Sequence, residues 1–144
     1  MVKRDLKKAM PEALKIAQEH STPFGAVLID KNFKVLAAAA NSTSTDGLLA
    51  HAEMNLLSIA GAELKDLSPY ALVSTCEPCP MCMSAILWYG IEKVYFGASI
   101  DDAAKYLSQL KIPAREVVQQ SGRKAEVHGG IMHKECIKLF EDLH

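Results

Sequence analysis

The sequence predicts an α/β fold, a three-layer α/β/α sandwich built around a mixed central sheet of about five strands. Two apolar runs, residues 24–30 and 33–40, are separated by the tight turn Lys31-Asn32 and favour a β-hairpin. Later apolar runs alternate with segments of helical periodicity, which is typical of strands joined by helices. The hairpin runs are mostly apolar along their whole length, as expected for strands that helices cover on both faces.

In the first half of the chain, periodicity and turn residues locate each element. Leu6, Met10 and Leu14 recur at helical spacing in the first segment, although Pro11 interrupts it. Beyond the hairpin, Ser and Thr predominate in a polar loop, and Gly61 is expected to end the helix that follows. The predicted elements are a helix over residues 3–20, strands over 24–30 and 33–40, a loop over 41–47 and a helix over 48–60.

In the second half, strands and helices alternate. A buried strand runs directly into a cluster of cysteines, and Gly90 is expected to end the helix after that cluster. Asp101 and Asp102 suit the start of a short helix, and Ile137 and Phe140 belong to the apolar stripe of the last one. The predicted elements are a strand over residues 71–75, a helix over 80–89, a strand over 93–97, a helix over 101–110, a strand over 125–128 and a helix over 131–143.

Length and composition limit the classes of protein. A chain of 144 residues with 49% apolar residues is expected to form one globular domain, residues 1–144. No apolar run approaches the roughly 20 residues of a membrane helix, and no signal peptide is apparent, so we expect a cytoplasmic protein. A net charge of −1 gives no overall electrostatic attraction for nucleic acid. The basic residues between positions 3 and 8 are interpreted as a solvated helix face rather than an RNA-binding edge.

Cys79 and Cys82 have the spacing of metal ligands on one face of a helix. Pro78 and Pro80 suit the start of that helix, where free N–H groups and the helix dipole favour thiolates. With His51, these two cysteines make a three-ligand zinc site whose fourth position stays open, as in catalytic sites. The alternative is a capped core histidine and two buried thiols, which we consider the weaker interpretation because all three residues lie at predicted helix starts.

Glu53 follows the proposed histidine ligand by two residues, which is about 200° of rotation inside a helix. The two side chains therefore converge only if the helix begins close to His51, and we predict a helix N-terminus at about residues 49 to 52. A carboxylate beside a zinc site can accept a proton from water and pass it on. The alternative role for Glu53 is a carboxylate that is merely favoured by the helix dipole.

The motifs His51-Ala52-Glu53 and Pro78-Cys79-Pro80-Met81-Cys82 resemble those of the cytidine deaminase-like superfamily. Within it, the chain is most similar to the branch of guanine deaminases, cytosine deaminase and tRNA adenosine deaminases. Residues 23–28, Asn41 and residues 85–91 also resemble that branch, so the resemblance covers about half of the chain. Residues 46–49 (DGLL) differ from the Asp-Pro-Thr that the family often has before its histidine.

This resemblance implies a zinc-dependent hydrolase that removes the exocyclic amine of a nucleobase or nucleoside as ammonia. It implies one Zn²⁺ held by His51, Cys79 and Cys82, with Glu53 as the catalytic proton carrier. It also implies that Asn41, Phe24 and Ala52 contact the substrate, although Asn41 could instead form an Asx-turn and Phe24 could be simple core. We expect a guanine or cytosine type of substrate and a homodimer, with a tRNA adenosine deaminase as the alternative.

Two functions of other classes remain open at this point. One is a catalytically silent, zinc-stabilised interaction domain. The other is a thiol–disulfide oxidoreductase, because Cys76 and Cys79 form a C-x-x-C pair at a strand-to-helix junction. A redox pair would leave His51 and Glu53 without a role, so Cys76 is interpreted as a small buried residue. Cys136, on the apolar face of the last helix, is likewise expected in the core.

Overall fold

The computed structural model describes residues 2–143, and the strands of this part of the chain form one sheet in the order β2-β1-β3-β4-β5. β1 (Gly25–Ile29) pairs antiparallel with both β2 (Val35–Ala40) and β3 (Ala71–Cys76). β4 (Lys93–Ala98) and β5 (Glu126–His128) continue the sheet in parallel with β3. The sheet is therefore mixed and has five strands, as predicted.

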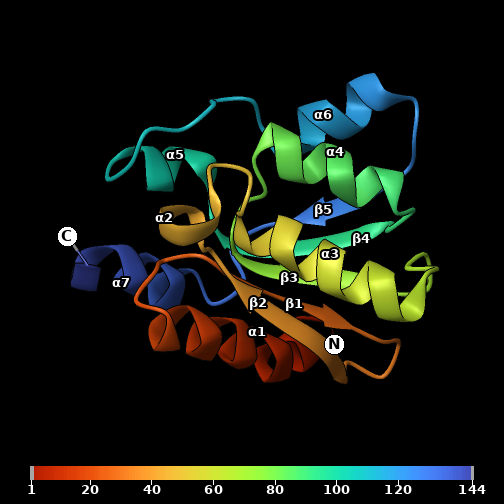
Figure 1. Cartoon of the computed structure of the whole chain (residues 1–144), viewed down its shortest axis with the longest axis horizontal. Coiled ribbons are helices and arrows are strands. Elements are labelled where there is room, and N and C mark those ends of the chain that lie inside the picture. Colours follow the sequence, from red (N-terminus) through yellow and green to blue (C-terminus); the bar gives the residue numbers. More distant parts are fainter. Residues whose placement is uncertain (1, 144) are drawn as a thin grey trace.

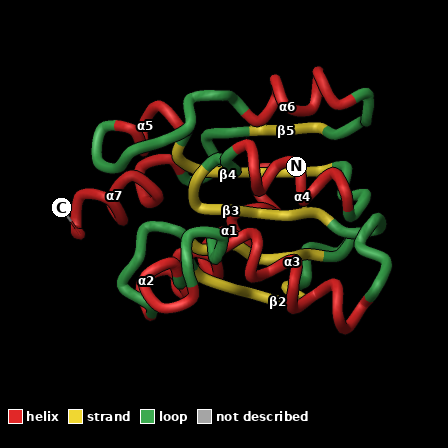
Figure 2. The backbone as a smooth tube through the Cα atoms, turned by 45° about the horizontal axis from the view of Figure 1, so that its top comes forward, coloured by secondary structure: helices red, strands yellow, loops and turns green. Residues whose placement is uncertain are grey.

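Helices cover both faces of the sheet (Figure 1). α1 (Val2–Glu19) and α7 (His133–Leu143) lie on one face. On the other face lie α3 (Ala52–Leu64), α4 (Pro80–Trp88) and α6 (Ala114–Ser121). Each face has its own apolar cluster, so the three-layer α/β/α prediction is confirmed. Figure 2 shows the strands of the sheet side by side, from β5 at the top to β2 at the bottom.

Two helices, α1 and α3, differ from the prediction. α1 continues through Pro11 without a break. α3 begins at Ala52 rather than residue 48, and it extends past Gly61 to Leu64. Gly61 does not end α3, because its missing Cβ makes room for a neighbouring ring: a Cβ there would lie 2.7 Å from the ring of Tyr89. This glycine allows α3 and the end of α4 to approach closely.

The prediction of one helix over residues 101–110 was wrong. The observed helix α5 (Ile100–Ala104) is short, and residues 105–113 form an irregular connection to α6, which the sequence analysis missed. The signals for α6 are Pro113 at its N-cap and Gly122 just beyond its end, with a left-handed φ of 73°. A second missed helix is the single turn α2 (Thr43–Asp46), which lies within the predicted loop.

Burial corrects one detail of the predicted core and confirms another. β2 is an edge strand whose first four residues are only partly covered or exposed, so this strand is not enclosed on both faces. On α7, Cys136 lies in the core as expected, because Cys136 and Phe140 belong to the apolar cluster shared with α1. No helix within residues 2–143 is both long and apolar enough to cross a membrane.

Candidate metal centre and substrate pocket

Two helix starts meet at one edge of the sheet. His51 is the N-cap residue of α3, with φ −68° and ψ 157°. Cys79 is the N-cap residue of α4, with φ −67° and ψ 169°, and Pro80 follows it as the first helical residue. Extended backbone at both N-caps turns these side chains off the helix ends and toward each other. The predicted helix start at about residues 49 to 52 is confirmed.

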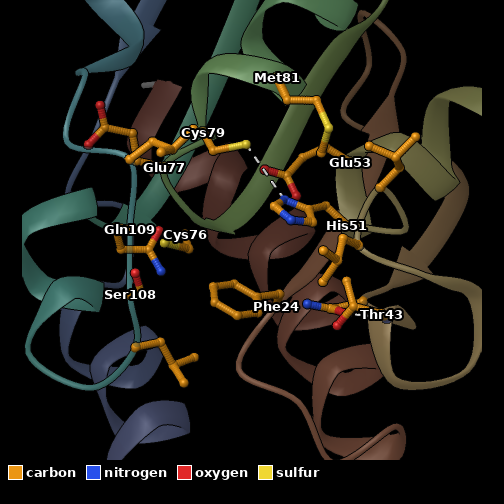
Figure 3. Close-up of a pocket in the computed structure, with 15 residues that line it drawn as sticks. Phe24, Thr43, His51, Glu53, Cys76, Glu77, Cys79, Met81, Ser108 and Gln109 are labelled. Atoms are coloured by element: carbon orange, nitrogen blue, oxygen red, sulfur yellow. Dashed lines mark hydrogen bonds between the residues drawn. The ribbon is translucent and has the colours of Figure 1, made fainter.

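The convergence brings one nitrogen and two sulfurs together. His51 Nδ1 lies 3.6 Å from Cys79 Sγ and 3.5 Å from Cys82 Sγ, and all three atoms are within 4.8 Å of one another. Figure 3 shows the pair His51 and Cys79 facing each other across the mouth of the site. In tetrahedral zinc sites with Zn–S bonds of about 2.3 Å and Zn–N bonds of about 2.0–2.1 Å, nitrogen and sulfur ligands lie about 3.6 Å apart. The three residues therefore fit a zinc ion.

The pKa values of the two cysteines are shifted in opposite directions. A hydrogen bond from the Cys82 thiol, aided by the Cys82 N–H and by His51, lowers the pKa of Cys79 to about 4. The same hydrogen bond and the burial of the side chain raise the pKa of Cys82 far above its ordinary value. The hydrogen bond to Cys79 also raises the pKa of His51. A divalent metal replaces this proton and binds both sulfurs as thiolates.

Glu53 lies in the first turn of α3 and is only 5% exposed. Burial raises the pKa of its carboxyl group to about 7, and the negative charge on Cys79 acts in the same direction. Figure 3 shows the carboxylate beside the imidazole of His51, at the back of the cavity. A carboxyl group with a pKa near neutral pH can both accept and return a proton, which is the property required of a general acid–base.

A cavity of about 550 Å³ opens in front of these four residues, a size that suits a small organic molecule. Its walls are mainly apolar, and no lysine or arginine is among its lining residues. The residues that line it are Phe24, Asn41, Thr43, Leu48, Leu49, His51, Glu53, Cys76, Glu77, Cys79, Met81, Leu107, Ser108, Gln109 and Leu110.

Two of the three residues expected to contact the substrate line this cavity. Phe24 packs edge-on against Phe140, with ring centroids 5.5 Å apart, and presents its other side to the cavity. Asn41 forms the Asx-turn considered as its alternative role, because its Oδ1 accepts the Thr43 N–H at 2.7 Å. That bond leaves the Nδ2 donors for the cavity. Ala52 is fully buried, backbone included, and is not among the residues that line the cavity.

Several cavity residues escaped the sequence analysis. Leu48 and Leu49 form an exposed apolar rim, 84% and 69% exposed, before His51. Residues 107–110 form the opposite wall, which Figure 3 shows through Ser108 and Gln109. Their segment was predicted to be helical, and a helix over residues 101–110 would have given no such wall. Pro113 was the one signal of an extended connection there.

The remaining cysteines fit the structural interpretation. All four cysteines are free thiols. Cys76 is 3% exposed, and burial raises its pKa well above the ordinary value, so it is a poor redox nucleophile. Cys136 is fully buried, and burial raises its pKa to about 12. His133, at the start of α7, lies near Cys136 in sequence, but its Nε2 contacts Asp102 Oδ2 at 2.9 Å.

The fold and the site together define a zinc-dependent hydrolytic deaminase: a His/Cys/Cys metal site, a buried carboxylate and a cavity at the edge of a mixed α/β sheet. Comparison with known families agrees. The profile described as "Cytidine and deoxycytidylate deaminase zinc-binding region" matches residues 3–98. The chain belongs to this family, so it is an enzyme and neither a silent zinc domain nor a thiol oxidoreductase.

Individual relatives cover nearly the whole chain. A "Probable cytosine deaminase" of Schizosaccharomyces pombe is 30% identical over 88% of this chain and 84% of its own length. A "tRNA-specific adenosine deaminase" of Bacillus subtilis is 35% identical over 91% of this chain and 81% of its own. Among solved structures, NE0047 in complex with 2,6-diaminopurine is 26% identical, with a TM-score of 0.83, covering 94% of this chain and 79% of the other.

Proposed function

We propose that this chain deaminates a free nucleobase or nucleoside, of the guanine or cytosine type. The observation that carries the proposal is the composition of the cavity in front of His51, Glu53, Cys79 and Cys82. Its lining has apolar walls and side-chain amides but no lysine or arginine. A phosphate group would enter such a cavity without a cation to neutralise it, which is unfavourable in a partly enclosed site.

The proposed roles follow from the positions of the side chains. His51, Cys79 and Cys82 hold the Zn²⁺, which supplies activation of a water molecule as the nucleophile. Glu53 takes the proton from this water, because its buried carboxyl has a pKa of about 7. Glu53 then gives this proton to a ring nitrogen, takes a second proton from the hydroxyl group that now sits on the ring carbon, and passes it to the amine, which leaves as ammonia while the ring carbon becomes a carbonyl. The leaving amine requires no further acid, since the same carboxyl serves in both directions.

The substrate contacts are assigned to opposite sides of the cavity. Asn41 offers only N–H donors, because its carbonyl oxygen is engaged by the Thr43 N–H. It therefore suits a carbonyl oxygen or an unprotonated ring nitrogen at the edge of a base. Phe24 forms a flat apolar wall for the ring. Ala52, which lies between His51 and Glu53, would reach the substrate only after a local change of structure, because the whole residue is buried.

The proposal is tested by ammonia release from the zinc-loaded protein. The panel contains cytosine, guanine, adenine, their nucleosides, the matching 5′-monophosphates and a tRNA anticodon stem-loop. We expect release from one base or nucleoside and at least about a hundredfold lower kcat/KM for its 5′-monophosphate, given the cost of an unpaired charge. Equal turnover of the monophosphate would contradict the inference drawn from the uncharged walls.

A tRNA adenosine deaminase is the second candidate, favoured by the 35% identity to the Bacillus subtilis enzyme. The net charge of −1 and the absence of lysine and arginine from the cavity lining argue against it. Release of ammonia from the stem-loop alone, with an affinity that falls steeply as salt rises, would establish this candidate in place of the first.

We also propose that residues 1–144 act as one deaminase domain, in the cytoplasm and as a homodimer. The continuous five-stranded sheet supports the single domain. Exposed Leu48, Leu49 and Trp88 support association, because the apolar side of α7 is already buried within the chain. Light scattering during gel filtration measures the mass of the particle directly. A mass equal to one chain at micromolar concentration would contradict the proposed homodimer.

A further inference from the structure

Glu77 points away from the metal centre, although it lies only two residues before Cys79 (Figure 3). Its carboxylate accepts hydrogen bonds from two backbone N–H groups in distant parts of the chain. Oε1 accepts the N–H of Ile100 at 3.0 Å, and Oε2 accepts the N–H of Ala114 at 2.8 Å. The backbone N–H of Glu77 is also fixed, since it donates to Ala98 O at 2.8 Å.

The two bonded N–H groups lie at the first residues of α5 and α6, where helices leave backbone donors without internal partners. Ile100 is 3% exposed and Ala114 is fully buried, so water is a poor substitute for the carboxylate. A carboxylate has two acceptor oxygens and no donor, which matches two converging N–H groups. A glutamine could satisfy one of them and would turn its own NH₂ toward the other.

The segment between these helix starts is the second wall of the cavity. Residues 105–113 join α5 to α6, and Leu107, Ser108, Gln109 and Leu110 line the cavity. Near its beginning, Tyr106 stacks on Phe140, with ring centroids 5.4 Å apart. The far end of the segment reaches Ala114, so the position of Gln109 and Leu110 depends most on the Glu77–Ala114 bond.

We propose that Glu77 is a positioning residue that ties the substrate-selecting segment 105–113 to the loop carrying Cys79. One carboxylate holds the start of α5, which leads into the segment, and the start of α6, which follows it. Glu77 also belongs to the backbone that leads into the metal site. The segment is thereby placed at a set distance from the metal, and its side chains contact the part of the substrate remote from the reacting amine. This inference rests on the proposed deaminase function of the cavity.

The test compares Glu77→Gln and Glu77→Ala with Asp30→Ala. Asp30 is a matched control, because its Oδ1 also accepts two backbone N–H groups, from Asn32 and Lys34, at the far end of β1. Residue-resolved amide hydrogen exchange is expected to accelerate at least about tenfold at Ile100 and Ala114 in Glu77→Ala, since bonds to charged acceptors are lost. In Glu77→Gln, at least one of the two amides should accelerate while the central strands stay protected.

Kinetics separate positioning from catalysis. With zinc content unchanged, Glu77→Gln should raise KM at least about tenfold and leave kcat within about threefold, because contacts remote from the reacting amine serve ground state and transition state alike. Asp30→Ala should leave KM unchanged. Unaltered exchange at both amides, or a loss of zinc and kcat together, would overturn the inference. If the wild type deaminates nothing in the panel, the proposed function fails while the exchange experiment still decides the role of Glu77.

Discussion

The two walls of the cavity are built in different ways. One wall consists of the starts of α3 and α4, where helix geometry itself directs His51, Glu53 and Cys79 toward a common point. The other wall, residues 105–113, has no regular structure and is placed by side chains elsewhere, among them Glu77 and Phe140. The first wall holds the chemistry of the reaction, and the second is suited to selecting the substrate.

This difference in construction predicts how substitutions in each wall affect the protein. Metal ligands at helix starts are held by backbone hydrogen bonds that run the length of the helix, so their relative positions are rigid. An irregular segment has few such bonds and can change shape when its anchors change. Substitutions in the first wall should therefore abolish the reaction, whereas substitutions around the second should alter substrate affinity or local stability.

The largest effect is expected from Cys82→Ala. This residue is fully buried, and its sulfur lies 3.5 Å from His51 Nδ1. Losing one of three protein ligands should remove zinc and all measurable ammonia release. Metal analysis and the activity assay check this, with Cys136→Ala as the matched control, because it is a fully buried cysteine on α7 away from the cavity. Full zinc occupancy in Cys82→Ala would exclude the residue from the metal site.

The next effect is expected from Glu53→Ala, which should lower kcat by about 10²- to 10⁴-fold while zinc remains bound. The reason is that the other carboxylate among the described residues that line the cavity, Glu77, already accepts two backbone N–H groups. Glu63→Ala is the control, because Glu63 is an exposed carboxylate on the same helix. Wild-type kcat in a zinc-loaded Glu53→Ala protein would end the proposed role.

The smallest effect is expected on thermal stability and its dependence on pH, through Asp102 on α5. Partial burial acts to raise the pKa of Asp102, but hydrogen bonds from the Ser99 N–H and from His133 outweigh it and lower the pKa. A lowered pKa means that the carboxylate stabilises the fold above its unfolded pKa of about 3.9, and that this contribution disappears as pH falls through the lower folded value. Asp102→Asn should therefore lower Tm by about 2–4 °C at pH 7.

The same measurement at acid pH provides the control for Asp102. Once the pH falls below the lowered folded pKa of Asp102, both proteins carry a neutral side chain at position 102, so their Tm values should converge. A difference in Tm that stays constant from pH 7 down through this acid range would show that packing, and not the charge on Asp102, is responsible.

The sequence was most informative where one residue type has few alternative uses. His51, Cys79 and Cys82 at predicted helix starts indicated the metal site, and the pair His51 and Glu53 predicted the beginning of α3, because two side chains two residues apart converge only at a helix start. Residues 105–110 were predicted to be helical because their local composition does not oppose a helix. What ends α5 is tertiary: Glu77 bonds the starts of both flanking helices, and Tyr106 stacks on Phe140. Such contacts leave no periodic trace in a sequence.

Asn55, on α3, has a consequence for protein engineering. Its Nδ2 donates to Ala40 O at 2.9 Å, to Ser42 Oγ at 3.0 Å and to Ala50 O at 3.4 Å, and so it fastens the loop that carries Leu48 and Leu49. Hydrogen bonds therefore hold each side of the cavity: those of the Asn55 amide hold one side, and those of the Glu77 carboxylate hold the other. New loop sequences can be grafted between these fixed points, so libraries with altered specificity can be built without touching the zinc ligands.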